Sequence, residues 1–430
     1  MPHTTQSAPT ASGHLPIIGS SLNMLYDPLT YLTKEYQKHG SVFRVKMGLQ
    51  NYVIMAGLEA NQFLAKEGER VFSSESLFGG LARAMNTDVL LAMLDGTPHR
   101  HMRKLHRRGF SRSAGMEHLE TMMEVAQEHL SKWDTEIAVF DSMRRLVVDQ
   151  LGIITTGIRP GEYFDDILTY INNMLNVEAV KVMPRIMLKR PKFIKAHQRV
   201  IEFGKKVLEQ HRQTASENPD LIDDILNGVR PDGDSFTEDD LISMAVGPFL
   251  AGMDTVASTL SFIVYALAKH PDIYQRLQVE LSQETDFKNM PLLHAFVLEV
   301  LRLYPATPFT PRVVSQEFEF AGYTFPIGTE VMIAQCVTHL LPAYYDDPFT
   351  FSIDRQNNVP SNVFAPYSLG AHTCLGAGLA ELQMMVTAAT LIRHASFTFI
   401  QPDYTVKIHT LPLPNPGKKF KVRVNKLAVS

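Results

Sequence analysis

The sequence predicts a mainly helical protein with a smaller β-rich part, and three of its features support this prediction. Residues 237–270 form one long, almost entirely apolar stretch that stops before a proline, as expected of a buried helix that crosses a whole domain. Residues 115–230 contain repeated amphipathic runs with helical spacing. Short segments of alternating apolar and polar residues, which predict strands, occur at 41–55, at 318–333 and after 397.

The composition is that of a globular protein with a sizeable core. Of the 430 residues, 45% are hydrophobic and 20% are charged. Length alone suggests two or three domains, and a single large core is the alternative. The net charge of -4 gives no reason to expect nucleic-acid binding. The two cysteines, Cys336 and Cys374, are too few for a disulfide framework, so we expect a cytoplasmic protein.

Residues 1–13 predict a flexible N-terminal tail. This segment is polar, rich in Thr, Ser and Pro, and carries no apolar run of the length that a signal or anchor needs. We therefore expect neither a secretory signal nor a transmembrane anchor. The chain also ends soon after the region around Cys374, so we expect no fused reductase.

The next elements are a helix over 29–39 and a hairpin made of strands 41–47 and 52–55. Residues 72–94 then predict a long loop, rich in Gly and Ser at first and apolar afterwards. Loops of this length usually line a site or are mobile. A surface loop with a few buried anchors is the equally simple alternative.

Residues 97–108 predict a basic helix whose first turn contains Pro98. His99 and Arg103 are four residues apart and so share one helical face. A neighbouring basic stripe consists of Arg100, Lys104, Arg107 and Arg108. A charge run of this kind, taken alone, is more often a solvated face than a binding site. Further along, residues 183–196 mix basic and apolar side chains, which suits either a solvated helix–loop–helix or contact with a membrane surface.

The long apolar helix of 237–270 begins at a predicted cap, Ser235 or Thr237, followed by acidic residues. Its middle contains Asp254 and Thr255, and a buried polar pair is costly unless it is hydrogen-bonded or used. An isolated Asp-Thr pair is more often a local cap or kink than a functional group. Pro248 lacks a backbone donor, so we expect it to bend the helix.

A second apolar helix, 294–303, carries Glu299 and Arg302 three residues apart on one face. Such a pair is usually an exposed ion pair, but apolar neighbours on all sides indicate burial here.

Cys374 lies where a polar, Gly-containing loop turns into a helix. Free amide hydrogens and the helix dipole at this point favour an anion, so we expect a lowered thiol pKa. Gly370 allows a tight turn, and Gly376 leaves room for a flat object near the backbone. The chemistry leaves four roles open for this cysteine: nucleophile, redox thiol, metal ligand or inert core residue.

The spacing G-x-H-x-C-x-G, formed by Gly370, His372, Cys374 and Gly376, resembles the haem-binding loop of the cytochrome P-450 family, here residues 364–381. The resemblance extends over the chain from Leu15 onward and implies the cytochrome P-450 fold, with residues 14–430 as one domain. It implies heme b (iron protoporphyrin IX) as cofactor, with Cys374 as the axial thiolate ligand of the iron.

Four further segments carry the resemblance and imply roles for their residues. The segment D-G-x-x-H-x-x-x-R implies that His99 and Arg103, together with Arg312, bind the haem propionates. The pattern A-G-x-D-T implies that Ala251 borders the oxygen groove and that Asp254 and Thr255 deliver protons. The resemblance also implies that Glu299 and Arg302 lock onto Arg355. Haem contacts are implied for two further loop residues, Tyr367 and His372.

The chain departs from the family pattern at three places. Tyr367 stands where the family usually has Phe, and Gly247-Pro248 interrupts the helix above the groove. The usual P-E-R-F reads Ile353-Asp354-Arg355-Gln356.

The function implied by the resemblance is that of a haem-thiolate monooxygenase which inserts one atom of O2 into a lipophilic small molecule such as a terpenoid, steroid, fatty acid or polyketide. Its electrons would come from a separate ferredoxin or flavodoxin docked on the basic stripe, and we expect a monomer. A peroxide-dependent peroxygenase and a non-enzymatic haem sensor are the alternatives, against which Asp254 and Thr255 argue. The substrate pocket is expected to include residues of several segments, almost all of them apolar: Phe78, Leu81, Met85, Phe249, Leu250, Ala251, Thr307, Phe309, Leu411 and Leu413.

Overall fold

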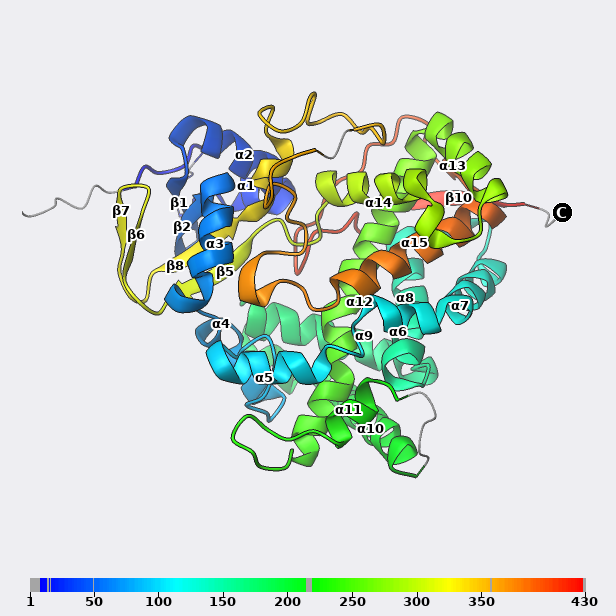
Figure 1. Cartoon of the computed structure of the whole chain (residues 1–430), viewed down its shortest axis with the longest axis horizontal. Coiled ribbons are helices and arrows are strands. Elements are labelled where there is room, and N and C mark those ends of the chain that lie inside the picture. Colours follow the sequence, from blue (N-terminus) through cyan, green and yellow to red (C-terminus); the bar gives the residue numbers. More distant parts are fainter. Residues whose placement is uncertain are drawn as a thin grey trace, which may run out of the picture.

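The computed structural model describes residues 8–13, 15, 17–48, 50–213, 219–355 and 358–427. A helical body makes up most of the molecule, and a β-rich part lies at one end of it (Figure 1). The predicted mainly α fold with a small β part is confirmed.

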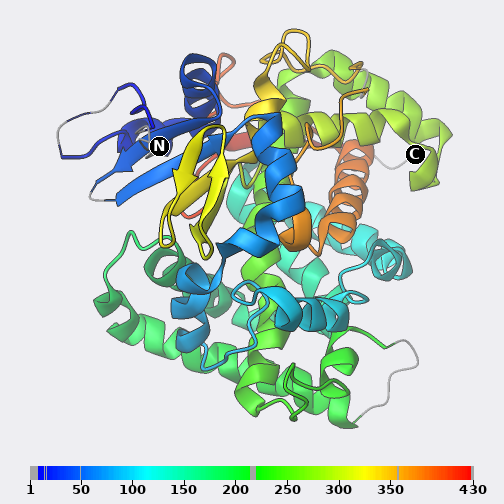
Figure 2. The ribbon, with the colours of Figure 1, turned by 60° about the vertical axis from the view of Figure 1, so that its left-hand side comes forward.

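The β-rich part is built on a five-stranded sheet in the order β1-β2-β8-β5-β3. The predicted hairpin forms its edge, because β1 and β2 pair antiparallel, whereas β2 and β8 pair parallel. Figure 2 shows this sheet together with the β6–β7 hairpin at one end of the molecule. A three-stranded sheet, β4-β10-β9, lies apart from it. The strands are β1 (Val42–Met47), β2 (Gln50–Ala56), β3 (Phe72–Ser73), β4 (Glu136–Ala138), β5 (Thr310–Val314), β6 (Phe318–Phe320), β7 (Tyr323–Phe325), β8 (Glu330–Ala334), β9 (Ala395–Phe399) and β10 (Lys421–Lys426).

The helices account for most of the chain between these strands. The α-helices are α1 (Ser21–Tyr26), α2 (Pro28–His39), α3 (Leu58–Val71), α4 (Glu75–Ala84), α5 (Gly96–His106), α6 (Arg112–Glu117), α7 (Leu119–Lys132), α8 (Val139–Thr156), α9 (Phe164–Met174), α10 (Pro191–Gln213), α11 (Leu221–Leu226), α12 (Glu238–Lys269), α13 (Pro271–Gln283), α14 (Pro291–Leu303) and α15 (Ala377–His394). Short 3-10 or π turns are η1 (Gly161–Tyr163), η2 (Leu175–Ala179), η3 (Arg185–Lys189), η4 (Phe287–Asn289), η5 (Gln335–Leu340) and η6 (Gly370–His372).

The central element is α12, which crosses the helical body (Figure 1). Thr237 caps it in a reciprocal capping box with Asp240. The helix is long and apolar enough to span a bilayer, yet it is a core helix, because most of it is buried in the fold. It packs closely on α8, where a Cβ on Gly252 would come within 2.9 Å of Leu151 Cδ1. A larger residue at this position would require the Leu151 side chain to move.

Two expectations about the chain's first hundred residues are wrong. Residues 8–13 are not a free tail, because the Ala11 amide donates to the Arg44 carbonyl and the Arg44 amide donates to the Pro9 carbonyl, both in contact with β1. Residues 1–7 of the predicted tail lie outside the described residues. The predicted loop 72–94 contains strand β3 and helix α4, because Gly79 and Gly80 are tolerated inside a helix whose other residues favour it.

Candidate active site

A cavity of about 310 Å³ lies between α5, α12 and the loop that leads into α15. In Figure 1 this loop lies between α5 and α12. The wall from α12 is apolar for most of its length, and the opposite wall carries Cys374 and several basic side chains. The cavity lining includes Val89, His99, Arg103, Ser243, Met244, Gly247, Pro248, Leu250, Ala251, Gly252, Thr255, His372, Cys374 and Gly376.

Cys374 is held in place by the turns on either side of it. Its amide donates to the Tyr367 carbonyl at 2.9 Å, and α15 begins three residues later at Ala377. Gly370 has φ +75°, and a Cβ there would come within 2.8 Å of the Leu64 carbonyl oxygen, so only glycine fits this turn. The Cys374 side chain faces the cavity, which is its route to solvent.

The prediction of a lowered pKa for the Cys374 thiol is wrong for a thiol that is not bound to a metal ion. Burial raises the pKa of this thiol and outweighs the lowering by the Gly376 amide and by the positive charge of Arg103. A metal ion that binds the sulfur would remove the proton, because a coordinating thiol is deprotonated. The site therefore suits a metal ligand better than a free nucleophilic thiolate.

Basic groups gather beside the cavity with few acidic partners. His99 stacks on His372 with ring centroids 4.0 Å apart, and His372 Nε2 lies 3.2 Å from Asp95 Oδ1. Burial, then the nearby His372 and Arg103, lower the pKa of His99 to about 4. Burial also lowers the pKa of Arg312 to about 10. These shifts show that the groups are held in a poorly solvated place where an anion would stabilise their charge.

This cluster fits a flat group that bears carboxylates. Within the described residues, His99 Nδ1 is buried without a hydrogen-bond partner. The side chains of His99, Arg103 and His372 line the cavity, whereas that of Arg312 lies buried next to it. A buried polar atom without a partner is rare in proteins, so His99 Nδ1 indicates a missing partner. A charge-assisted bond to a carboxylate would satisfy it.

Thr255 and Asp254 follow one another on α12 but face different surroundings. Thr255 lines the cavity, and its hydroxyl donates to the Ala251 carbonyl at 2.9 Å. Asp254 does not line the cavity; both of its carboxylate oxygens accept hydrogen bonds from Arg144 of α8, at 2.7 and 2.9 Å. Both side chains of this ion pair are 5% exposed. The polar pair predicted from the sequence is thus divided between the cavity and a buried ion pair.

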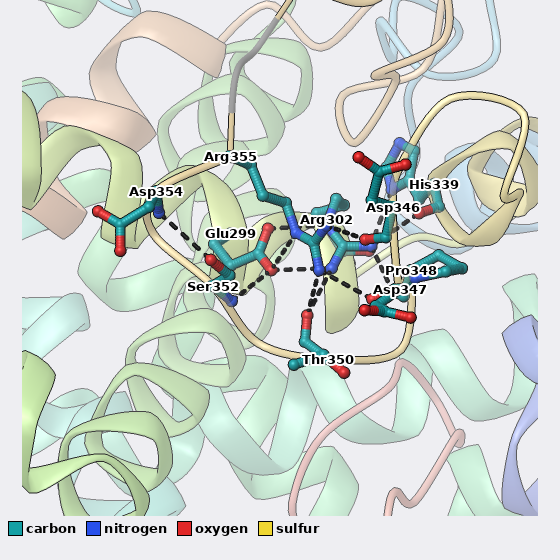
Figure 3. Close-up of polar contacts among 10 residues, drawn as sticks. All are labelled: Glu299, Arg302, His339, Asp346, Asp347, Pro348, Thr350, Ser352, Asp354 and Arg355. Atoms are coloured by element: carbon teal, nitrogen blue, oxygen red, sulfur yellow. Dashed lines mark hydrogen bonds and ion pairs between the residues drawn. The ribbon is translucent and has the colours of Figure 1, made fainter.

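Glu299, Arg302 and Arg355 meet in a buried network outside the cavity (Figure 3). Arg302 donates to both Glu299 oxygens at 2.7 and 2.8 Å, and Arg355 Nε donates to Glu299 Oε1 at 3.1 Å. Arg302 and Arg355 also donate to backbone carbonyls between residues 339 and 350. The network fixes the segment that precedes the Cys374 loop.

Of the residues predicted for the substrate pocket, Leu250 and Ala251 line the cavity; Phe78, Leu81, Met85, Phe249, Thr307, Phe309, Leu411 and Leu413 do not. Phe249 is buried against Phe203, because it lies about 100° around α12 from Leu250. Leu81 and Met85 face the main core from α4. Leu411 is 40% exposed on the surface. Residues 89–92, which belong to the segment 72–94 that was expected to line a site, complete the cavity wall.

Sequence reasoning missed two polar residues of the site. Arg144 resembles any other basic residue of an amphipathic helix, and only its place opposite α12 shows that it is buried. Asp95, which precedes α5, accepts from the Ser74 amide and the Ser73 hydroxyl as well as facing His372. An Asp before a Gly-Thr-Pro helix start indicates a cap, so no local pattern indicates its contact with His372.

A cysteine at a loop-to-helix turn, in a cavity that basic side chains and a long core helix also line, fits the class of haem-thiolate proteins. The comparisons agree. The chain belongs to the cytochrome P450 family, because the family model "Cytochrome P450" matches residues 9–424. The resemblance found in the sequence is therefore confirmed.

Known relatives are distant but similar over their full length. The "Putative cytochrome P450 120" of Synechocystis sp. is 25% identical over 99% of this chain and 99% of its own. The cyclooctat-9-en-7-ol 5-monooxygenase of Streptomyces melanosporofaciens is 24% identical over 91% of this chain and 89% of its own. The solved structure of the retinoic acid-bound cyanobacterial CYP120A1 superimposes with a TM-score of 0.84 at 25% identity, covering 98% of this chain and 100% of that one.

Members of this family are haem monooxygenases in which a cysteine ligates the haem iron. The protein is accordingly an oxidoreductase with a haem-thiolate centre. When bound, the haem supplies the oxygen-activating chemistry, and the polypeptide supplies the ligand, the surroundings and the protons.

Proposed function

We propose that this protein is a monooxygenase that inserts one oxygen atom of O2 into a lipophilic small molecule in the cytoplasm, using electrons from a separate protein. The observation that carries the proposal is the apolar α12 wall that faces Cys374 across the cavity, interrupted by Thr255. Two relatives carry lipophiles in their names, retinoic acid and cyclooctat-9-en-7-ol, which supports a lipophilic substrate here.

Cys374 would hold the haem iron, while His99, Arg103 and Arg312 would hold the propionates. His372, Gly376, Ala251 and the Tyr367 backbone would frame the ring. These assignments rest on the cavity lining, on the Cys374–Tyr367 hydrogen bond and on the buried His99 Nδ1 described above. The apolar wall excludes water, which strengthens every charge interaction inside the cavity.

Thr255 would present its hydroxyl to the oxygen-binding space. The Thr255 hydroxyl donates its hydrogen to the Ala251 carbonyl, so its oxygen is free to accept a hydrogen bond from a group in the cavity. Asp254 would resupply protons only after its ion pair with Arg144 loosens, because both of its oxygens are engaged there. Arg144 would thus hold the Asp254 carboxylate in place without touching the substrate or the haem.

The electron donor, a ferredoxin or flavodoxin, would dock on the basic stripe. The stripe is weaker than the sequence suggests, because Arg100 pairs with Glu69 and Arg108 pairs with Asp224. Lys104 and Arg107 are exposed and have no acidic partner in the part of the chain that the structure describes. Lys104 and Arg107 would therefore attract an acidic electron-donor protein to the side of the molecule on which the Cys374 loop lies.

Residues 110–112, which follow α5 and begin α6, lie against the start of α15, so the segment that continues the stripe reaches the loop that holds Cys374. A Cβ on Gly376 would be 3.6 Å from the Phe110 ring, and a Cβ on Gly378 would be 3.3 Å from Arg112. An electron entering at the stripe would therefore have a short path to the iron ligand.

The test is turnover of a panel of terpenoid, steroid and fatty-acid lipophiles by the haem-loaded protein, with a ferredoxin, its reductase and isotopically labelled dioxygen. The proposal expects a substrate-induced change of the haem spin state and a product that carries one labelled atom. Turnover with peroxide but not with the electron-transfer proteins would identify a peroxygenase. Spin-state changes without any turnover would favour a haem sensor.

A further inference from the structure

The α12 wall of the cavity contains one polar side chain that nothing in the fold uses. α12 is described along its whole length, and its polar side chains that line the cavity are those of Ser243 and Thr255. Thr255 is hydrogen-bonded to its own helix. The Ser243 hydroxyl, by contrast, is buried and has no hydrogen-bond partner among the residues that the structure describes. A buried hydroxyl left unpaired is unfavourable and indicates a partner that is absent.

The acidic side chain nearest to Ser243 along the helix, that of Asp240, is engaged by other groups. Asp240, one turn earlier, accepts from the Thr87 hydroxyl at 2.6 Å, from the Thr237 amide at 3.0 Å and from Arg230 at 2.5 Å. These bonds engage both of its oxygens and tie the start of α12 to the loop that leads to Val89. The end of the cavity near Ser243 is therefore held firmly in place.

Because Pro248 is part of the helix, a backbone acceptor next to Ser243 in the sequence has no helical donor. Proline has no amide hydrogen, so the carbonyl of Met244, four residues earlier, loses its helical donor. Met244, Gly247 and Pro248 all line the cavity. A Cβ on Gly247 would meet no atom within 4 Å, so open space remains next to the interrupted turn. A hydroxyl donor and a backbone acceptor thus lie one residue apart on an otherwise apolar wall.

We propose that Ser243 and the Met244 carbonyl form an anchor for a single hydroxyl group at one end of an otherwise apolar substrate. A substrate hydroxyl would accept a hydrogen bond from Ser243 and donate one to the Met244 carbonyl. A ketone could only accept, and a hydrocarbon could do neither. The proposal deepens the proposed function and rests on it, because it names the substrate class of the same cavity.

The anchor also sets the length of the substrate. Ser243 precedes Ala251 by eight residues and Thr255 by twelve, which at 1.5 Å per residue places it about 12 to 18 Å along the helix axis from the reaction site. The oxidised carbon should therefore lie well away from the anchored hydroxyl, near the opposite end of an elongated molecule. The chemistry defined in this way is an apolar alcohol that is oxidised far from its existing hydroxyl.

The experiment measures dissociation constants of the haem-loaded protein for dodecanol, decyl methyl ketone and dodecane by calorimetry and by the haem spin-state change. Wild-type protein should bind dodecanol more tightly than the ketone, and the ketone more tightly than dodecane. Ser243→Ala should weaken binding of the alcohol and the ketone by roughly three- to tenfold and leave dodecane unchanged. Pro248→Ala restores the helical donor and should weaken the alcohol relative to the ketone.

The matched control is Ser261→Ala on the same helix, because the Ser261 hydroxyl is buried but donates to the Ala257 carbonyl at 2.6 Å and does not line the cavity. It should alter none of the three constants. The inference is overturned if wild-type protein shows no preference for the alcohol over dodecane, or if Ser243→Ala keeps that preference. The proposed function fails separately, if the preference is present but no lipophile is oxygenated.

Discussion

The buried ion pair between Arg144 and Asp254 should be much more important for stability than the exposed pair made by the very next residue. Arg144 and Asp254 join α8 to α12 through two hydrogen bonds, and both side chains are 5% exposed. Arg145 pairs with Asp165 at 3.0 Å, but these side chains are 54% and 78% exposed. Each arginine also lies over a phenylalanine ring, at 3.9 and 4.2 Å.

The two ion pairs therefore differ mainly in burial, which is high for both members of the Arg144 pair and low for both members of the Arg145 pair. Arg144→Met leaves the Asp254 charge buried without its partner, which should cost about 3–5 kcal/mol of unfolding free energy. Arg145→Met should cost less than about 1 kcal/mol, because water replaces an exposed partner. Adding Asp254→Leu to Arg144→Met removes the isolated charge and should recover much of the loss.

The assay is urea unfolding of the haem-loaded variants, followed by circular dichroism and compared through the midpoints at equal slope. The expected order of midpoints is wild type and Arg145→Met together, then the double variant, and Arg144→Met lowest. An Arg144→Met midpoint that drops no further than that of Arg145→Met would refute the buried-charge argument.

Three further predictions follow from single sites. Thr255→Ala should keep haem and substrate binding but divert electrons to peroxide, since loss of a proton-transfer group costs about a hundredfold or more in rate. The control is Thr259→Ala, because the Thr259 hydroxyl bonds within the helix and lies off the cavity. Equal coupling of electron use to product in both variants would count against a proton-transfer role for Thr255. His339 is buried and neutral, with Nδ1 donating to the Arg302 carbonyl at 3.1 Å and Nε2 accepting from the Ala365 amide at 2.8 Å. Burial lowers the pKa of His339 from 6.5 to about 3, so between these pH values the unfolded chain binds a proton that the folded chain does not. Stability should therefore fall as the pH drops from 6.5 towards 3. His339→Gln should flatten the dependence of the unfolding midpoint on pH in that range, and an unaltered slope would contradict this. Lys104→Glu with Arg107→Glu should slow haem reduction by an acidic donor and weaken its salt dependence without changing substrate affinity. The control is Lys189→Glu with Lys192→Glu, which makes the same change of charge at the end of η3 and the start of α10. Equal slowing by both double variants would place the docking site elsewhere.

The parts of the fold that could be predicted are those with strong local patterns. The capped, apolar run of α12 and the loop-to-helix turn at Cys374 are both encoded in a few consecutive residues. The order of motifs along the chain then identified the family. Local patterns failed at α4, where glycine and serine suggested a loop although the surrounding residues form a helix.

The details of the site depended on how helices are rotated against each other, which no local pattern records. Leu250 and Phe249 are equally apolar neighbours, yet only Leu250 faces the cavity. Arg144 became the partner of Asp254 only through the packing of α8 on α12. The thiol pKa of Cys374 is another example, because burial, a property of the whole fold, outweighs the local effect of the helix start.

The central claim is that Cys374 is the thiolate ligand of the haem iron, and the most direct measurement is the absorption spectrum of the reduced protein with carbon monoxide. We predict the strongly red-shifted Soret band of thiolate-ligated haem in the wild type and in Cys336→Ala, because Cys336 is buried and lies off the cavity. Cys374→Ala should lose this band. A Cys374→Ala protein that kept the red-shifted band would contradict the account and assign the ligand to Cys336.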